Sequence, residues 1–306
     1  AELQSWSAAT GGDSWPLAWI AEQTEPVAGL GGILAWALAG VPVQPLKLGD
    51  RLLGCVFEDE HARYCRLTNL LPTDHSQTRA AQAREVLELM EAGLRAIGMD
   101  FRHVVRTWFY IRDILSWYDE FNRVRDQFFK ERGVLTGVVP ASTGVGVRGC
   151  GTPGVALQGG LIAVESRDGT VRTEAVPSPL QCPALDYGSS FSRAVELATP
   201  NHRSLFISGT ASIAPEGETQ HVGDVSAQIA YTLEVVRAIL ESRDMGWIDV
   251  TNAIGYFKHA RDVPLWHKHC AGTPLAKIPI ILTENDICRS ELLFELELAA
   301  ATTTTR

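Results

Sequence analysis

The sequence has no cysteine pair in CxxC spacing, no excess of positive charge and no apolar run long enough to cross a membrane. The longest apolar stretch, residues 27–43, is too short and too rich in glycine for a membrane span. It predicts instead the start of a buried strand or helix. Irregular cysteine spacing argues against a disulfide framework and favours a reduced, cytoplasmic chain. The six cysteines are Cys55, Cys65, Cys150, Cys182, Cys270 and Cys288.

Charge and histidine content narrow the partners further. Acidic residues number 36 against 27 basic ones, which gives a net charge of −9. Nucleic acid and anionic membranes repel such a chain, so neither is expected as a partner, although local arginines can still bind a small anion. His267 and His269 stand two residues apart, but no set of cysteines or carboxylates completes a ligand shell, so no metal is expected. The first residues carry no signal-peptide pattern, which also favours the cytoplasm.

Apolar periodicity predicts alternating strands and helices in the first half of the chain. Alternate apolar residues indicate a strand, and apolar residues at every third or fourth position indicate a helix with one buried face. The elements expected, in order, are strands over 51–59 and 62–70, a helix over 77–99, a strand over 103–113, a helix over 116–132, a Gly/Pro-rich connection over 138–154 and a strand over 155–166.

The same order of elements returns in the second half. Gln82 falls opposite Gln228 and Tyr110 opposite Tyr256, at a spacing of 146 residues. Such a long period indicates a domain duplication rather than a solenoid repeat. The elements of the second copy are a strand over 202–214, a helix over 222–246, a strand over 247–262, a short helix from Val263, and strands within 278–299.

These patterns predict an α+β fold with four segments. Each unit is expected to form one sheet with two helices on one face. The other face of each sheet has to be hidden against another copy, which predicts a barrel-like assembly with helices outside and ligand clefts where units meet. The segments are an irregular N-terminal portion with short strands (1–50), a first unit (51–168), a linker (169–190) and a second unit (191–306).

One carboxylate stands out because it lies inside an apolar strand. In the run from Leu292 to Leu298, Phe294 and Leu296 alternate with Glu295 and Glu297. A carboxylate on a buried face has to be paired, hydrogen-bonded or protonated. Glu295 is therefore either part of a solvated edge strand or a proton donor whose pKa is raised by apolar walls, with Glu297 as the next candidate for that role.

Several long motifs resemble the chorismatases, meaning the FkbO-like enzymes and the xanthomonad 3-/4-hydroxybenzoate synthases, which are built from YjgF/RidA-like units. The similarity runs from about residue 50 to residue 300. It implies tandem YjgF/RidA-like, chorismate-mutase-like units in a pseudo-trimeric barrel, with the N-terminal portion supplying the third unit. The motifs are WYDEFNRVRDQFFKERG, PASTGVGVRG, YGSSFSRAVEL, LFISGTASIAPEG, HVGDVSAQI and ENDICRSELLFELE.

The resemblance implies cleavage of chorismate without a cofactor. Glu295 matches the glutamate that protonates the methylene carbon of the enolpyruvyl ether, after which pyruvate leaves. Cys288 resembles the branch that forms hydroxybenzoate, whereas Ala211 resembles the branch that forms a dihydroxycyclohexadienoate. The combination of Cys288 with Ala211 resembles that of the xanthomonad enzymes, which release both 3- and 4-hydroxybenzoate. Cys288 is then a proton shuttle, a contact to the ring, or simply a packed thiol.

The two carboxylates of chorismate require cations or oriented amides. Arg148 lies in a glycine-rich stretch, and Arg193 lies near the boundary between the units. Arginine suits bidentate carboxylate binding, although either residue can equally be a surface arginine. Tyr187 is a candidate hydrogen-bond donor or a partly buried linker residue. Gly209 and Thr210 are candidates to offer backbone N–H groups to the substrate.

Two alternative functions stay open at the level of sequence. A YjgF-like imine deaminase would carry an arginine about one strand before Glu295, where this chain has Ile280. A catalytically silent ligand-binding protein would have no need of Glu295, Cys288 and Arg148 together. The expected partner is a small molecule, chorismate, bound by a monomer or weak homo-oligomer. By resemblance, the product would feed a pigment, ubiquinone or a macrolide starter unit.

Overall fold

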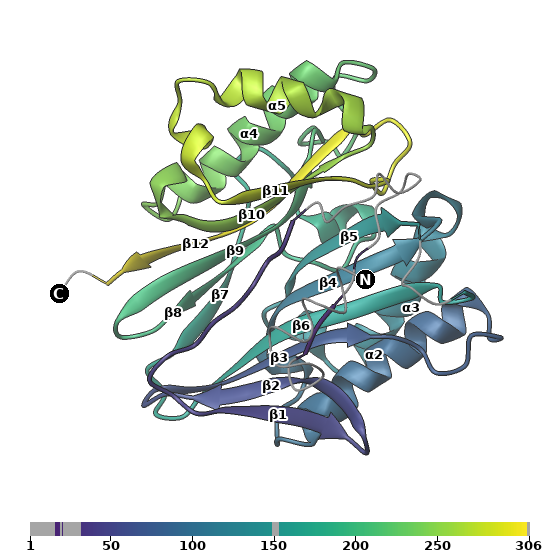
Figure 1. Cartoon of the computed structure of the whole chain (residues 1–306), viewed down its shortest axis with the longest axis vertical. Coiled ribbons are helices and arrows are strands. Elements are labelled where there is room, and N and C mark those ends of the chain that lie inside the picture. Colours follow the sequence, from purple (N-terminus) through teal and green to yellow (C-terminus); the bar gives the residue numbers. More distant parts are fainter. Residues whose placement is uncertain (1–15, 19, 21–31, 149–152, 305–306) are drawn as a thin grey trace.

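A computed structural model of the chain describes residues 16–18, 20, 32–148 and 153–304. In these residues two six-stranded sheets face each other, and helices cover the outer face of each sheet (Figure 1). The first half contains β1 (Val43–Leu48), β2 (Arg51–Glu58), β3 (Ala62–Leu70), α2 (Arg79–Arg95), β4 (Val104–Arg112), α3 (Tyr118–Glu131), β5 (Ala141–Val147) and β6 (Leu157–Ser166).

The second half repeats this order of elements. Its strands run β7-β8-β9-β12-β10-β11 across the sheet, which matches β1-β2-β3-β6-β4-β5 one for one. In each sheet only the last pair, β4 with β5 or β10 with β11, is parallel. The elements are β7 (Arg172–Val176), β8 (Ala194–Ala198), β9 (His202–Ala211), α4 (Val225–Glu241), β10 (Val250–Phe257), α5 (Val263–Cys270), β11 (Ile280–Glu284) and β12 (Phe294–Thr303). The predicted α+β duplication is thus confirmed.

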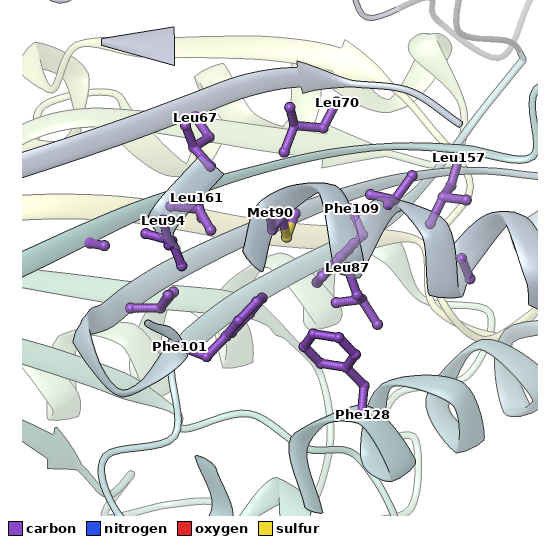
Figure 2. Close-up of a cluster of buried hydrophobic side chains, with 14 of the residues drawn as sticks. Leu67, Leu70, Leu87, Met90, Leu94, Phe101, Phe109, Phe128, Leu157 and Leu161 are labelled. Atoms are coloured by element: carbon purple, nitrogen blue, oxygen red, sulfur yellow. The ribbon is translucent and has the colours of Figure 1, made fainter. Parts of the chain in front are cut away.

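Each unit buries an apolar core between its sheet and its helices. Figure 2 shows Leu87 and Met90 of α2 pointing at the sheet, where Phe109 and Leu161 meet them. Phe128 of α3 closes this core against Phe101, with ring centroids 5.0 Å apart. In the second unit α4 and α5 cover β9, β10 and β12 in the same way. Apolar burial of this kind contributes roughly 25 cal/mol per Å².

The inner faces of the two sheets share a second apolar layer. Tyr110 of the first unit and Tyr256 of the second lie in one cluster with valines of β5. The sheets also join where β5 meets β9, because the Ser142 N–H donates to Ser208 Oγ at 2.8 Å. Residues far apart in the sequence therefore line the space between the sheets.

Four details differ from the sequence-based expectation. The Gly/Pro-rich connection over 138–154 contains β5, and the linker over 169–190 contains β7. The described residues before Val43 form no helix or strand, so a third unit and a closed barrel do not appear in the described chain. The apolar stretch over 27–43 lies partly outside the described residues, and its described residues after Gly32 are mostly exposed. No described helix is long and apolar enough to cross a membrane.

A buried glutamine fixes each long helix to the segment that leads into β6 in the first unit or β12 in the second. Gln82 Nε2 donates to the Gly154 carbonyl at 3.2 Å, and its Oε1 accepts from the Ala156 N–H at 2.8 Å. Gln228 repeats this with the Glu291 carbonyl at 2.9 Å and the Leu293 N–H at 2.8 Å. The two glutamines aligned in the sequence are therefore structural equivalents.

We expect Gln228→Ala to lower the free energy of unfolding by about 1–3 kcal/mol, because buried backbone groups lose their partner. Gln82→Ala is the matched variant in the other unit and should cost a similar amount. Val222→Ala, at a 64% exposed side chain, should change stability by less than about 0.5 kcal/mol. Denaturant unfolding measures all three. A loss for Gln228→Ala no larger than that for Val222→Ala would contradict this role.

Candidate active site

The site is built on the inner face of β12. Phe294 and Leu296 point into the core beneath α4, so Glu295 and Glu297 point into the space between the sheets. β12 runs between β9 and β10, with Glu295 opposite Ala211 on one side and Tyr256 on the other. The predicted alternation is confirmed. Both carboxylates are buried, with exposed fractions of 4% for Glu295 and 5% for Glu297.

Glu297 is held as a carboxylate by donors from the opposite sheet. Arg106 Nη2 of β4 donates to it at 2.6 Å, and Trp108 Nε1 donates at 3.0 Å. The same Nη2 also donates to Thr143 Oγ1 of β5 at 2.5 Å. These charge-assisted hydrogen bonds fix the position of the Glu297 carboxylate.

Glu295 lies in the opposite situation. None of the described residues donates a hydrogen bond to its carboxyl group. Burial first, and then the charge of Glu297, raise the pKa of Glu295 to about 8, while Arg106 acts in the other direction. Gly209 of β9 makes room for the carboxyl, since a Cβ at this position would lie 2.1 Å from Glu295 Oε1. At neutral pH this group is therefore a carboxylic acid.

Cys288 and Ala211 lie together beside Glu295. They share an apolar cluster with Ile213, Ile287 and Leu292. Burial first, and then the Glu295 charge, raises the pKa of the Cys288 thiol to about 12, so it is a neutral thiol near pH 7. Cys288 also lines a surface pocket of about 650 Å³ between the start of α3 and residues 288–291.

The two predicted arginines, Arg193 and Arg148, come from segments outside β12. Arg193 is 4% exposed, and its Nε and Nη2 donate to the Cys182 carbonyl. Its positive charge acts on Cys288 and slightly opposes the rise in the pKa of that thiol. Arg148 is exposed just after β5, five residues beyond Thr143, which corresponds to roughly 16 Å of extended chain.

The remaining predicted residues lie on β9 and in the segment before β8. The Gly209 N–H donates to Thr143 Oγ1 at 3.0 Å. The Thr210 hydroxyl donates to the Ser208 carbonyl at 2.8 Å. Tyr187 ends the short 3-10 helix η5 (Ala184–Tyr187), and its side chain lies outside what the structure describes.

Sequence reasoning missed the residues that hold Glu297. Arg106 sits inside the apolar strand β4 just as Glu295 sits inside β12, and that was the signal that could have revealed it. Arg125 and Asn122 of α3 are also buried, and Arg125 Nη2 donates to Asn122 Oδ1 at 2.8 Å. No three His, Cys, Asp or Glu side chains gather into a metal-binding cluster within the described part of the chain.

Comparisons with known proteins find relatives that cover most of this chain. A 3-hydroxybenzoate synthase of Streptomyces hygroscopicus is 30% identical over 247 residues, covering 72% of this chain and 68% of that protein. The chain belongs to the chorismatase family. A chorismatase of Streptomyces rapamycinicus is 28% identical over 65% of this chain. The chain spans a little under two thirds of that relative's length, 64%.

Further matches describe the fold of this chorismatase-family chain. The family model for Endoribonuclease L-PSP matches residues 71–164, within the first unit. A crystal structure of a chorismatase superposes with a TM-score of 0.62 at 23% identity, covering 80% of this chain and 76% of that one. That likeness supports the tandem arrangement of YjgF/RidA-like units.

The raised pKa of Glu295 predicts an unusual dependence of stability on pH. Its folded-state pKa of about 8 lies above the ordinary value of 4.5. The folded protein therefore holds a proton that the unfolded chain has lost, so this contribution to stability is complete below pH 4.5 and disappears as the pH rises through 8. Glu295→Gln removes this dependence and should be more stable than the wild type at pH 9, by about 3–5 kcal/mol.

Denaturant unfolding at pH 4, 6.5 and 9 tests this prediction. Glu216→Gln, at an exposed glutamate, serves as the control and should follow the wild type at every pH. Parallel curves for Glu295→Gln and the wild type would show that Glu295 ionises normally.

Proposed function

We propose that this chain cleaves the enolpyruvyl ether of chorismate and releases pyruvate, with Glu295 as general acid. The observation that carries the proposal is a buried carboxylic acid with no donor from the described residues, beside a second carboxylate held by Arg106 and Trp108. A buried carboxylic acid next to a carboxylate in an ion pair is the arrangement expected of a general acid and its electrostatic partner. Membership of the chorismatase family supplies the substrate class.

The chemistry requires little beyond a positioned acid. Vinyl ethers hydrolyse through protonation of the methylene carbon, and Glu295 transfers its proton there while the ether oxygen stabilises the resulting oxocarbenium ion. The Glu295 carboxylate formed in this step faces the new positive charge. Water then adds to the cationic carbon and loses a proton, and the hemiketal collapses to pyruvate and the ring alcohol. The proton returned to the carboxylate completes the cycle.

The ring product is proposed to be 3-hydroxybenzoate, 4-hydroxybenzoate or both, formed when the ring diol loses one molecule of water and becomes aromatic. The dihydroxycyclohexadienoate itself, released before that loss, is the alternative. Ala211 and Cys288 share the apolar cluster next to Glu295, which suits contact with a ring. The Cys288 thiol is neutral at physiological pH, so it acts there as a weak donor and polarisable contact rather than as a thiolate.

Substrate carboxylates are assigned to the positive groups nearest this cluster. Arg193 is the better placed candidate, because its charge reaches Cys288 from the segment before β8. Arg148 would have to act from the end of β5. We propose the pocket beside Cys288, lined in part by Tyr118 and Arg289, as the route by which the substrate reaches Glu295.

Glu295→Gln should abolish most turnover. The amide keeps the shape of the side chain but has no proton to transfer to carbon, and loss of a general acid typically costs about 100- to 10,000-fold. Pyruvate release from chorismate, followed with lactate dehydrogenase, measures the rate. Chorismate binding, measured by calorimetry, should be unchanged or tighter. Turnover within about tenfold of the wild type would remove Glu295 from this role.

Cys288→Ala should keep pyruvate release within about threefold, because a neutral thiol is not the acid. It should reduce 3-hydroxybenzoate relative to the other ring products, because the contact beside Ala211 is lost. Chromatography of the products from a single reaction gives the ratio, and Cys270→Ala, at a buried cysteine of the second core, is the control. An unchanged ratio would leave Cys288 a packing residue.

A further inference from the structure

We propose that Glu297, fixed by Arg106 and Trp108, is a positioning residue whose negative charge keeps the neighbouring Glu295 protonated. This inference rests on the proposed function for its meaning in catalysis. The electrostatic coupling itself is a property of the folded chain. The two glutamates lie two residues apart on the same face of β12 and are both buried between the sheets.

The two glutamates differ in their hydrogen-bond partners: donors from the opposite sheet hold Glu297, whereas none of the described residues donates to Glu295. Glu297 accepts hydrogen bonds from Arg106 Nη2 at 2.6 Å and from Trp108 Nε1 at 3.0 Å. Arg106 is itself fixed, because it donates to Thr143 and its guanidinium lies 4.8 Å from the centre of the Trp108 ring. A like charge at close range in a region with little water disfavours a second carboxylate. Glu297 is the main charged group that raises the pKa of Glu295.

Charged and titratable groups around Glu295 come from several elements. Arg106 of β4 opposes the effect of Glu297, and the two tyrosines between the sheets, Tyr110 and Tyr256, have pKa values raised by burial and stay neutral. Cys288 faces Glu295 as a neutral thiol, with Arg193 beyond it. The neighbours on β9 and β5 carry no charge: Gly209, Thr210, Ala211 and Thr143.

Glu297→Gln is expected to lower the pKa of Glu295 by about one unit or more, because the charge of Arg106 is then unopposed. Carbon-13 NMR of protein labelled at the glutamate carboxyl carbons, without substrate, follows this titration, and Glu295→Gln assigns the signal. In the pH profile of pyruvate release, the fall in rate on the alkaline side should move to lower pH by the same number of units. Circular dichroism reports whether each variant folds.

Arg106 left without its partner is itself destabilising, so a second variant carries the test if Glu297→Gln unfolds. The double variant Glu297→Gln with Arg106→Gln removes both charges. It should lower the pKa of Glu295 by less than Glu297→Gln does, because Glu297 outweighs Arg106 in the intact site.

Two controls separate charge from packing. Trp108→Phe disturbs the same cluster but keeps the charge of Glu297, so the Glu295 titration should stay within about 0.3 units of the wild type. Glu91→Gln breaks a buried ion pair with Arg132 on the far helix layer and should also leave it unchanged. A Glu295 titration unaffected by Glu297→Gln, or moved equally by Trp108→Phe, would overturn the proposal.

The two readouts also separate this inference from the proposed function. If the NMR titration moves but the wild type releases no pyruvate from chorismate, the coupling stands and the function is wrong. If pyruvate is released but neither the titration nor the pH profile moves, the function stands and the coupling is wrong.

Discussion

The ion pair between Arg106 and Glu297 is the interaction on which the site depends. It joins β4 of the first unit to β12 of the second across the space between the sheets. Both side chains are almost fully buried, so removing either leaves a charge without water or a partner, which is far more costly than losing a surface pair. The intact pair adds little net stability, because both charges had to leave water to form it. It nevertheless restricts how the two units can pack, because any arrangement that separates the two side chains leaves a buried charge unpaired. It also places a fixed negative charge beside Glu295.

The duplication explains how the chain accommodates the buried carboxyl group of Glu295. Tyr110 pairs with Gln158 across β4 and β6, just as Tyr256 pairs with Glu295 across β10 and β12. The first unit thus has a neutral, buried glutamine at the position of the acid, and Gly160 at the position of Glu297. Two sheets with the same strand order consequently differ in chemistry at one face. The asymmetry confines the ionisable pair to one unit, while the other unit supplies the arginine that holds it.

The features that could be predicted from the sequence are those determined by local patterns of apolar residues. The helices over 77–99, 116–132 and 222–246 and the alternation around Glu295 are confirmed, because they follow from apolar periodicity. β5 was taken for a loop because its glycines resemble a flexible stretch, yet Gly146 is required by close approach to Asp286. The partnership of Arg106 with Glu297 spans 191 residues and two sheets, and no local pattern encodes it.

A protonated carboxyl at neutral pH requires two things that ordinary folding disfavours. The group has to be taken from water, and it has to be denied the donors that would stabilise its charged form. Here Glu295 is removed from water by the core of the second unit and by the apolar layer between the sheets. None of the described residues donates a hydrogen bond to its carboxyl group, and Gly209, which has no Cβ, leaves room for it. Such a site lowers stability at physiological pH relative to a glutamine at the same place. A strained group of this kind persists only where the surrounding structure over-determines it. The sheet register on both sides of β12, the Gln228 contact with Leu293 and the ion pair across the sheets supply that support.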